Sequence, residues 1–135
     1  MSNLVNFPVA LAMRYGSISI YNGLKELNDK GVKKITVLPL YPHYAMSSYE
    51  TVVEKVKEQT ELHFPHLKIK TIKPFYNDKY YINLLSNKIN DTIKKIDYDH
   101  ILFSYHGIPV SHLKISAPTK AHCFKVKDCC NKKSE

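Results

Sequence analysis

A histidine directly follows the last long apolar run of the chain. In ILFSYHGIPVSH, residues 101–112, His106 stands where a buried strand is expected to end. A neutral imidazole can accept a proton or bind a divalent metal ion, because its pKa is about 6.5 and its nitrogen is a borderline ligand. Position alone also allows a structural role, in which the ring only bonds the backbone. A catalytic role therefore requires other suitable groups nearby.

Three earlier segments supply such groups, each directly after an apolar run. They read MRYG (13–16), LYPHY (40–44) and PFYND (74–78). Ligands of open parallel sheets bind beyond the carboxyl ends of the strands, so these segments and SYHGIP (104–109) are expected at one edge. The side chains expected in the resulting crevice are Arg14, Tyr15, Tyr41, His43, Tyr44, Tyr76 and His106. Aromatic walls, one arginine and imidazoles suit a large, flat, partly apolar anion. A dinucleotide is disfavoured, since no G-x-G-x-x-G or P-loop turn is present.

The elements that must position these groups follow from periodicity. Four apolar runs predict strands, at residues 8–13, 34–40, 67–72 and 100–105, with helical periods between them. Expected helix N-caps are Ser17, Ser47 paired with Glu50, and Asp78. This alternation predicts parallel strands in a sheet covered on both faces. The expected fold is α/β, a small doubly wound parallel sheet of about four strands over residues 1–112, with 113–135 as a cysteine-containing loop or tail.

The composition of the chain restricts the classes of binding partner and the cellular locations that we expect. The 135 residues carry a formal charge of +8, but Arg14 is the only arginine among 20 basic residues. Because base-edge recognition relies on arginine, specific nucleic-acid binding is disfavoured. The sequence shows neither a membrane-spanning apolar run nor a signal peptide. Three cysteines, Cys123, Cys129 and Cys130, make a poor disulfide framework. We expect a cytoplasmic location, with peripheral contact to a membrane left open.

Three motifs in order, AMRYG, VLPLYPHYAMSS and SYHGIP, resemble ferrochelatases, and PTKAHCFKVKDCC is similar to bacterial members. These enzymes insert ferrous iron, a substrate, into a porphyrin at the end of haem synthesis. The resemblance implies that His106 faces the ring centre as proton acceptor or metal ligand, and that Gly107 allows close backbone approach. It also implies a set of residues at the porphyrin, namely Arg14, Tyr15, Tyr41, His43 (often glutamine in the family) and Tyr44. No organic cofactor is implied, and the cysteine spacing disfavours an iron–sulfur cluster.

The resemblance covers only part of the family pattern. Ferrochelatases are more than twice this long, and a glutamate in their second domain faces the histidine across the porphyrin. No residue here matches that motif, so the favoured interpretation is a fragment or truncated form, poorly active alone and completed by a second domain or a homodimer partner. Two alternatives stay open: a small homodimeric tetrapyrrole chelatase, and a porphyrin- or metal-binding module without catalysis. The sequence does not distinguish protoporphyrin from coproporphyrin.

Overall fold

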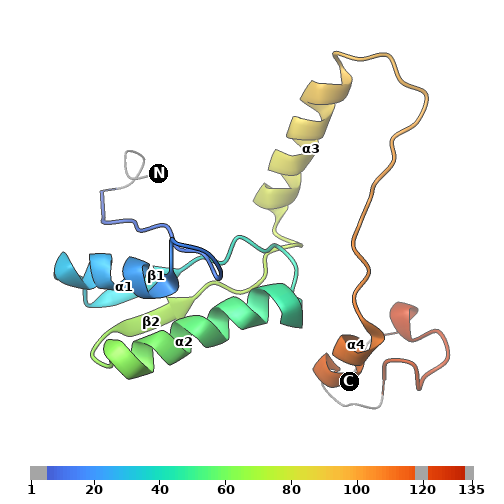
Figure 1. Ribbon diagram of the computed structural model, residues 1–135. Coiled ribbons are helices and arrows are strands. Elements are labelled where there is room, and N and C mark those ends of the chain that lie inside the picture. The colour runs from blue at the N-terminus through green and yellow to red at the C-terminus, as the bar shows by residue number, and fades with distance from the viewer. Residues whose placement is uncertain (1–5, 118–121, 133–135) are drawn as a thin grey trace. The chain divides into compact units, whose positions relative to one another are not determined.

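The computed structural model describes residues 6–117 and 122–132 and consists of two units, residues 1–75 and 76–135 (Figure 1). Each unit is described by itself. The first unit contains a sheet and two helices, and the second contains helices and extended segments. No helix in the described ranges is both long enough and apolar enough to cross a membrane.

Helix α1 (Ile20–Asp29) starts two residues later than its sequence suggests. Its N-cap is Ser19, whose hydroxyl accepts a hydrogen bond from the Asn22 amide at 3.1 Å. Ser17 is not the cap, because the Met13 amide donates a hydrogen bond to the Ile18 carbonyl at 2.7 Å, which keeps Ser17 inside the loop before the helix. Gly16 allows this loop through its left-handed φ of 93°. The prediction of a helix here is confirmed, and the predicted cap is wrong.

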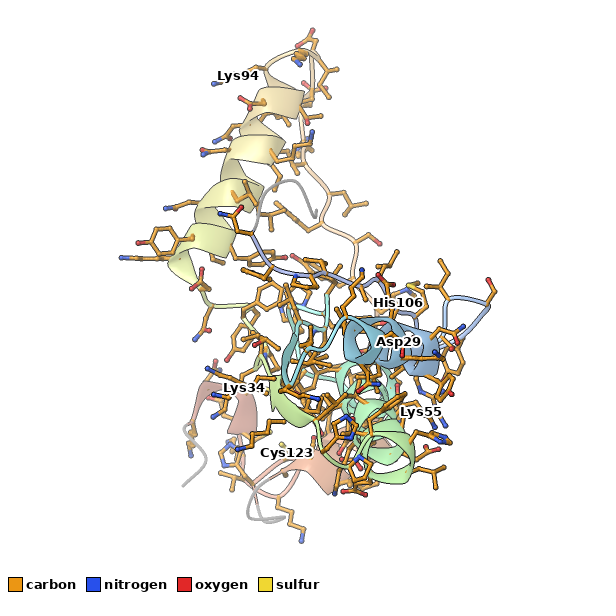
Figure 2. All side chains as sticks on the ribbon, turned by 90° about the vertical axis from the view of Figure 1, so that its left-hand side faces the viewer. Asp29, Lys34, Lys55, Lys94, His106 and Cys123 are labelled. Atoms are coloured by element: carbon orange, nitrogen blue, oxygen red, sulfur yellow. The ribbon has the colours of Figure 1, made fainter. Side chains whose placement is uncertain are left out.

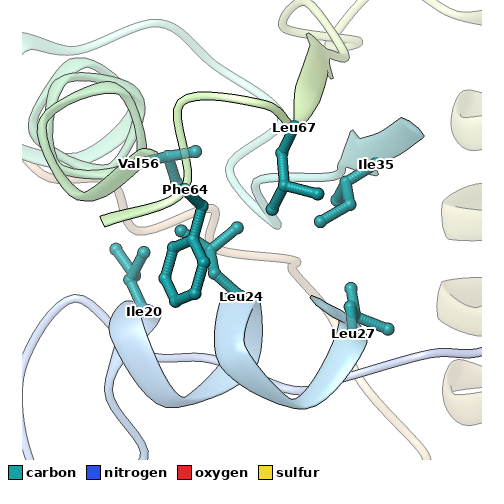
Figure 3. Close-up of a cluster of buried hydrophobic side chains, with 7 residues drawn as sticks. All are labelled: Ile20, Leu24, Leu27, Ile35, Val56, Phe64 and Leu67. Carbon is teal, nitrogen blue, oxygen red and sulfur yellow. The ribbon is translucent and has the colours of Figure 1, made fainter. Parts of the chain in front are cut away.

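The first unit has a parallel sheet of two strands, β1 (Lys34–Val37) and β2 (Lys68–Thr71). Lys34 pairs with Lys68 and Val37 with Thr71. Period-2 alternation directs Ile35 and Val37 of β1, together with Ile69 of β2, toward the helices. The buried core consists of Ile20, Leu24, Leu27, Ile35, Val56, Phe64 and Leu67 (Figure 3). Both helices of the unit supply side chains to this core, so they cover the same face of the sheet.

Helix α2 (Thr51–His63) follows a π-helical turn, η2 (Met46–Glu50). The expected capping box of Ser47 and Glu50 does not form: Glu50 is the cap residue and makes no capping bond with its side chain. Ser47 lies inside the π-helical turn and not at the N-cap, so the two residues do not occupy the positions that a capping box requires.

The four-strand count is not confirmed. Within the described residues the sheet has two strands, and residues 8–13 contribute only an isolated bridge between Met13 and Ser19. Residues 100–105 form no strand and are exposed. A segment becomes a strand only when a neighbour satisfies its backbone, and neither run has one here. Nor is the sheet covered on both faces, because Lys34, Thr36, Lys68 and Lys70 are exposed on the face away from the core. The structure is consistent with an α/β domain.

The second unit contains α3 (Lys79–Ile93), α4 (Val110–Ser116) and a short 3-10 turn, η3 (Cys129–Asn131). Asp78 caps α3 as predicted, because its carboxylate accepts hydrogen bonds from the amides of Tyr80 and Tyr81. The side chains of α3 project outward around the helix, and none of its residues is buried (Figure 2). Helix α4 was not expected, since seven residues carry too little periodicity. The domain boundary at residue 112 stays a prediction, and part of the 113–135 tail lies outside the described residues.

Candidate functional site

Arg14 is fixed at the carboxyl end of the extended segment 8–13. Its Nε donates a hydrogen bond to the Thr51 carbonyl at 3.1 Å, and this links the segment to the start of α2. Its guanidinium also lies over the Tyr15 ring, 4.6 Å from the centroid. The Tyr15 ring is otherwise exposed, at 73%. These contacts orient the guanidinium plane, and the hydrogen bond to Thr51 uses Nε.

The LYPHY segment lies beside the end of β2. The Phe75 amide donates to the Pro42 carbonyl, and the Tyr49 hydroxyl donates to the Ile72 carbonyl, both at 2.9 Å. The Tyr44 and Tyr49 rings are 6.0 Å apart at their centroids. The carboxyl ends of β1 and β2 therefore meet at one edge of the sheet, as predicted. His43 and Tyr44 are exposed at this edge.

Tyr44 has a perturbed titration. Partial burial, followed by its hydrogen bond to Glu50, raises the pKa of the phenol above 10.0. The side chain is 42% exposed and remains accessible to a ligand. It therefore stays a neutral hydrogen-bonding group across the physiological pH range.

A hollow of about 880 Å³ lies between the segment 8–13 and the chain around β1. We call it the interstrand hollow. Residues 7–14 form one wall, residues 36–41 form the opposite wall, and α1 supplies further lining through Ile20, Gly23, Leu24 and Leu27. Arg14 and Tyr41 both line it, at the carboxyl ends of the two walls. Two of the predicted site residues are thus brought to one cavity.

His106 and Gly107 belong to the second unit, as does Tyr76. His106 lies on the extended segment between α3 and α4 and is exposed (Figure 2). Gly107 has no left-handed φ, and a Cβ placed there would meet no atom within 4 Å. The local backbone therefore does not require glycine at this position. The predicted close approach to a porphyrin remains a prediction.

The three cysteines carry free thiols. Within residues 6–117 and 122–132, no three His, Cys, Asp or Glu side chains come together in a way that could hold a metal ion. A hydrogen bond with the Cys129 sulfur raises the pKa of the Cys130 thiol. His122 bonds the Cys129 carbonyl through Nε2 at 2.7 Å, which uses one ring nitrogen for local structure.

Sequence reasoning missed two residues that shape this edge. Tyr49 links η2 to the end of β2, and Gly16 closes the MRYG turn with its left-handed φ. The glycine carried a readable signal, since Gly supplies a positive φ in turns without steric cost. The tyrosine carried none, because its partner is 23 residues away.

The amino-acid sequence is similar to one protein family and to several of its members. A family model described as Ferrochelatase matches residues 1–134. Over 92% of this chain, a protein of Opitutus terrae called Ferrochelatase is 47% identical. Two more proteins of that name, from Pseudomonas fluorescens strain Pf0-1 and Stutzerimonas stutzeri strain A1501, are 41% and 39% identical over 94% and 93% of the chain. The chain spans only 36–37% of the length of these relatives. No solved structure matches it significantly.

Proposed function

This chain belongs to the ferrochelatase family, and we propose that it supplies one wall of a site that inserts ferrous iron into a porphyrin. The observation that carries the proposal is the family match over residues 1–134, which includes every strand-end motif. The sheet edge adds geometric support, because Arg14 and Tyr41 line one hollow there. Since the chain spans about a third of its relatives' length, the remaining wall would come from residues beyond these 135.

The first unit would hold the porphyrin. The bond from Arg14 to the Thr51 carbonyl uses Nε, so the two Nη groups remain as donors for a carboxylate of the porphyrin. Tyr15, Tyr41 and Tyr44 offer exposed aromatic faces for contact with a flat macrocycle. His43 adds an imidazole at the same edge. These residues would set affinity and orientation rather than carry out the proton transfers.

His106 would carry the chemistry at the ring centre. Insertion removes two pyrrole protons and places one ferrous ion among the four ring nitrogens, so charge balances when both protons leave. A neutral imidazole can accept one of these protons or bind the incoming iron. Gly107, next to it, would leave room for the macrocycle. The second proton needs another acceptor, and we assign that role to the part of the protein outside these residues.

The 135-residue chain alone should bind porphyrin but insert iron poorly. One wall leaves the other porphyrin face in water, and the proposal assigns one proton acceptor, His106, to this chain. A positioned acid or base typically contributes about 10²–10⁴-fold in rate. Turnover by the purified chain comparable with that of a full-length ferrochelatase would contradict this expectation.

The test joins this chain to the remaining part of the Opitutus terrae relative, so that both walls are present. In that protein His106→Ala should lower kcat about 10²–10⁴-fold while the porphyrin Kd, from a Soret titration, changes little. His100→Ala is the matched control, because His100 lies on the same exposed segment. It should metallate at the parental rate. Parental metallation by the His106 variant would show that this histidine has no role in the reaction.

A further inference from the structure

The π-helical turn η2 joins the LYPHY segment to helix α2. The carbonyl of its N-cap, Ala45, accepts hydrogen bonds from the amides of Ser48 and Glu50, both at 3.2 Å. The bond from Glu50 has the i+5 to i pattern that defines a π-helix. Turns of this kind are rare, and they occur frequently at functional sites. The side chains that this turn presents are therefore candidates for a role at the sheet edge.

Tyr49 connects η2 to the sheet. Its hydroxyl donates a hydrogen bond to the Ile72 carbonyl at 2.9 Å, in a partly buried contact. The Ile72 amide donates in turn to the Val37 carbonyl of β1, also at 2.9 Å. The acceptor of the Tyr49 hydroxyl thus belongs to a residue that is itself bonded to β1. The Tyr49 side chain is fixed at its far end as well as at its backbone.

The Tyr44 ring lies beside the Tyr49 ring. Their centroids are 6.0 Å apart, and the two planes are tilted by 53°. Tyr44 is 42% exposed, so a ligand can still reach it. Two residues earlier, the Pro42 carbonyl accepts a hydrogen bond from the Phe75 amide at 2.9 Å. Tyr44 is therefore held from two sides, by the backbone bond at Pro42 and by the ring of Tyr49.

A ring that is held in advance binds a flat ligand more tightly than a mobile ring does. Immobilising one side chain on binding costs about two- to tenfold in affinity. Contact with Tyr49 removes this cost for Tyr44, and it also sets the plane that the Tyr44 ring presents. The Tyr49 hydroxyl proton is already used by the Ile72 carbonyl. Tyr49 is thus suited to act through Tyr44 rather than on a ligand.

We propose that Tyr49 is a positioning residue for porphyrin binding: anchored on Ile72, it holds the Tyr44 ring at the sheet edge in the orientation that the macrocycle contacts. This inference rests on the proposed function, since Tyr44 would meet a porphyrin only if the chain forms a wall of that site. It adds that a residue of η2 sets the orientation of the wall before any ligand binds. Replacement of Tyr49 should therefore act on porphyrin binding only through Tyr44.

The first test needs no porphyrin. Tyrosines of the 135-residue chain are labelled with carbon-13 at the ring ε positions, and the Tyr44 resonance is the one that Tyr44→Phe removes. The neighbouring ring should displace this resonance from the position of free tyrosine. Tyr49→Leu should return it toward that position. Tyr49→Phe keeps the ring but loses the bond to the Ile72 carbonyl, so it should give an intermediate shift.

The second test is a Soret titration of the same variants with protoporphyrin and with coproporphyrin. Tyr49→Leu should raise the porphyrin Kd about two- to tenfold, and Tyr49→Phe should raise it less. In a Tyr44→Leu background, Tyr49→Leu should change the Kd by less than about twofold, because the ring that it positions is gone. A loss of stability alone would not produce this coupling, since the Kd refers to the folded protein.

Tyr21→Leu is the matched control. Tyr21 of α1 also packs against aromatic rings, with centroid distances of 5.0 Å to His63 and 5.6 Å to Phe64. It belongs neither to the LYPHY segment nor to η2. Its replacement should leave the Tyr44 resonance and the porphyrin Kd at their parental values. Far-UV circular dichroism verifies the fold of every variant, and Tyr49→Phe serves for both tests if Tyr49→Leu does not fold.

The possible failures are distinguishable. A Tyr44 resonance that the Tyr49 variants do not move would overturn the inference, and so would parental porphyrin binding by these variants. Equal effects of Tyr49→Leu with and without Tyr44 would also overturn it, because Tyr49 would then act independently of Tyr44. These three results leave the proposed function intact. If the parent chain binds neither porphyrin, the proposed function fails and the inference fails with it.

Discussion

Replacement of Arg14 by lysine separates the structural contacts of this residue from its charge. Lysine keeps the positive charge, but it lacks the planar fork that bonds the Thr51 carbonyl and stacks over Tyr15. The hydrogen bond is worth about 1 kcal/mol at this half-buried site. The stacking over an exposed ring adds about 0.5–1 kcal/mol, part of which lysine can retain. We expect Arg14→Lys to lower the free energy of unfolding by about 1–1.5 kcal/mol.

The assay is thermal unfolding of the 135-residue chain, followed by circular dichroism. For a unit of this size, 1 kcal/mol corresponds to about 4–8 °C, so the expected fall in Tm is about 4–12 °C. A cycle with Tyr15→Leu isolates the stacking contribution as the part of the loss that is not additive. A Tm unchanged by Arg14→Lys would refute the anchoring role derived from these two contacts.

The same variant tests the proposed carboxylate contact. Loss of a bidentate pair should weaken porphyrin binding about tenfold, equivalent to about 1.4 kcal/mol. A porphyrin with esterified carboxyl groups is the control ligand, because it has no carboxylate to lose. Its affinity should be the same for the parent and the Arg14→Lys chain. Equal loss of affinity for both porphyrins would assign the effect to the distorted turn instead.

Three further predictions follow from the first unit. Leu24→Ala, at a core position that is 5% exposed, should lower the free energy of unfolding by about 2–5 kcal/mol, as measured by urea unfolding. A urea midpoint close to that of the parent would be inconsistent with the core described here. Tyr49→Phe removes the hydrogen bond to the Ile72 carbonyl and should lower the free energy of unfolding by about 0.5–1.5 kcal/mol. The control Tyr80→Phe, on an exposed ring, should not change the free energy of unfolding measurably. Because the folded pKa of Tyr44 lies above 10.0, its contribution to stability is present below pH 10 and is lost as pH rises through the folded value. Absorbance titration of a Tyr44→Phe variant against the parent would contradict this if the missing phenol titrated at or below its ordinary pKa.

The parts of the fold that depend on local patterns could be predicted. Apolar runs followed by polar and aromatic residues located β1 and β2, and helical periods located α1, α2 and α3. The Asp78 cap was predictable because the cap and its bonded amides are adjacent in sequence. The family resemblance required only the motifs and their order, and the comparisons confirm it.

Other features depend on partners distant in sequence. The bond from Arg14 to Thr51 joins residues 37 apart, and that from Tyr49 to Ile72 joins residues 23 apart. Periodicity detects none of these contacts, because it compares only near neighbours along the chain.

The strands show this limit most clearly. The sequence by itself determined that residues 8–13 and 100–105 are apolar enough for strands, because composition is a local property. Whether they enter a ladder was decided only by tertiary structure, since a strand exists through hydrogen bonds to a neighbour. Residues 34–37 pair with residues 68–71, whereas residues 8–13 line the interstrand hollow. Apolar character selects a segment for burial, and the presence of a partner edge decides whether it becomes part of a sheet.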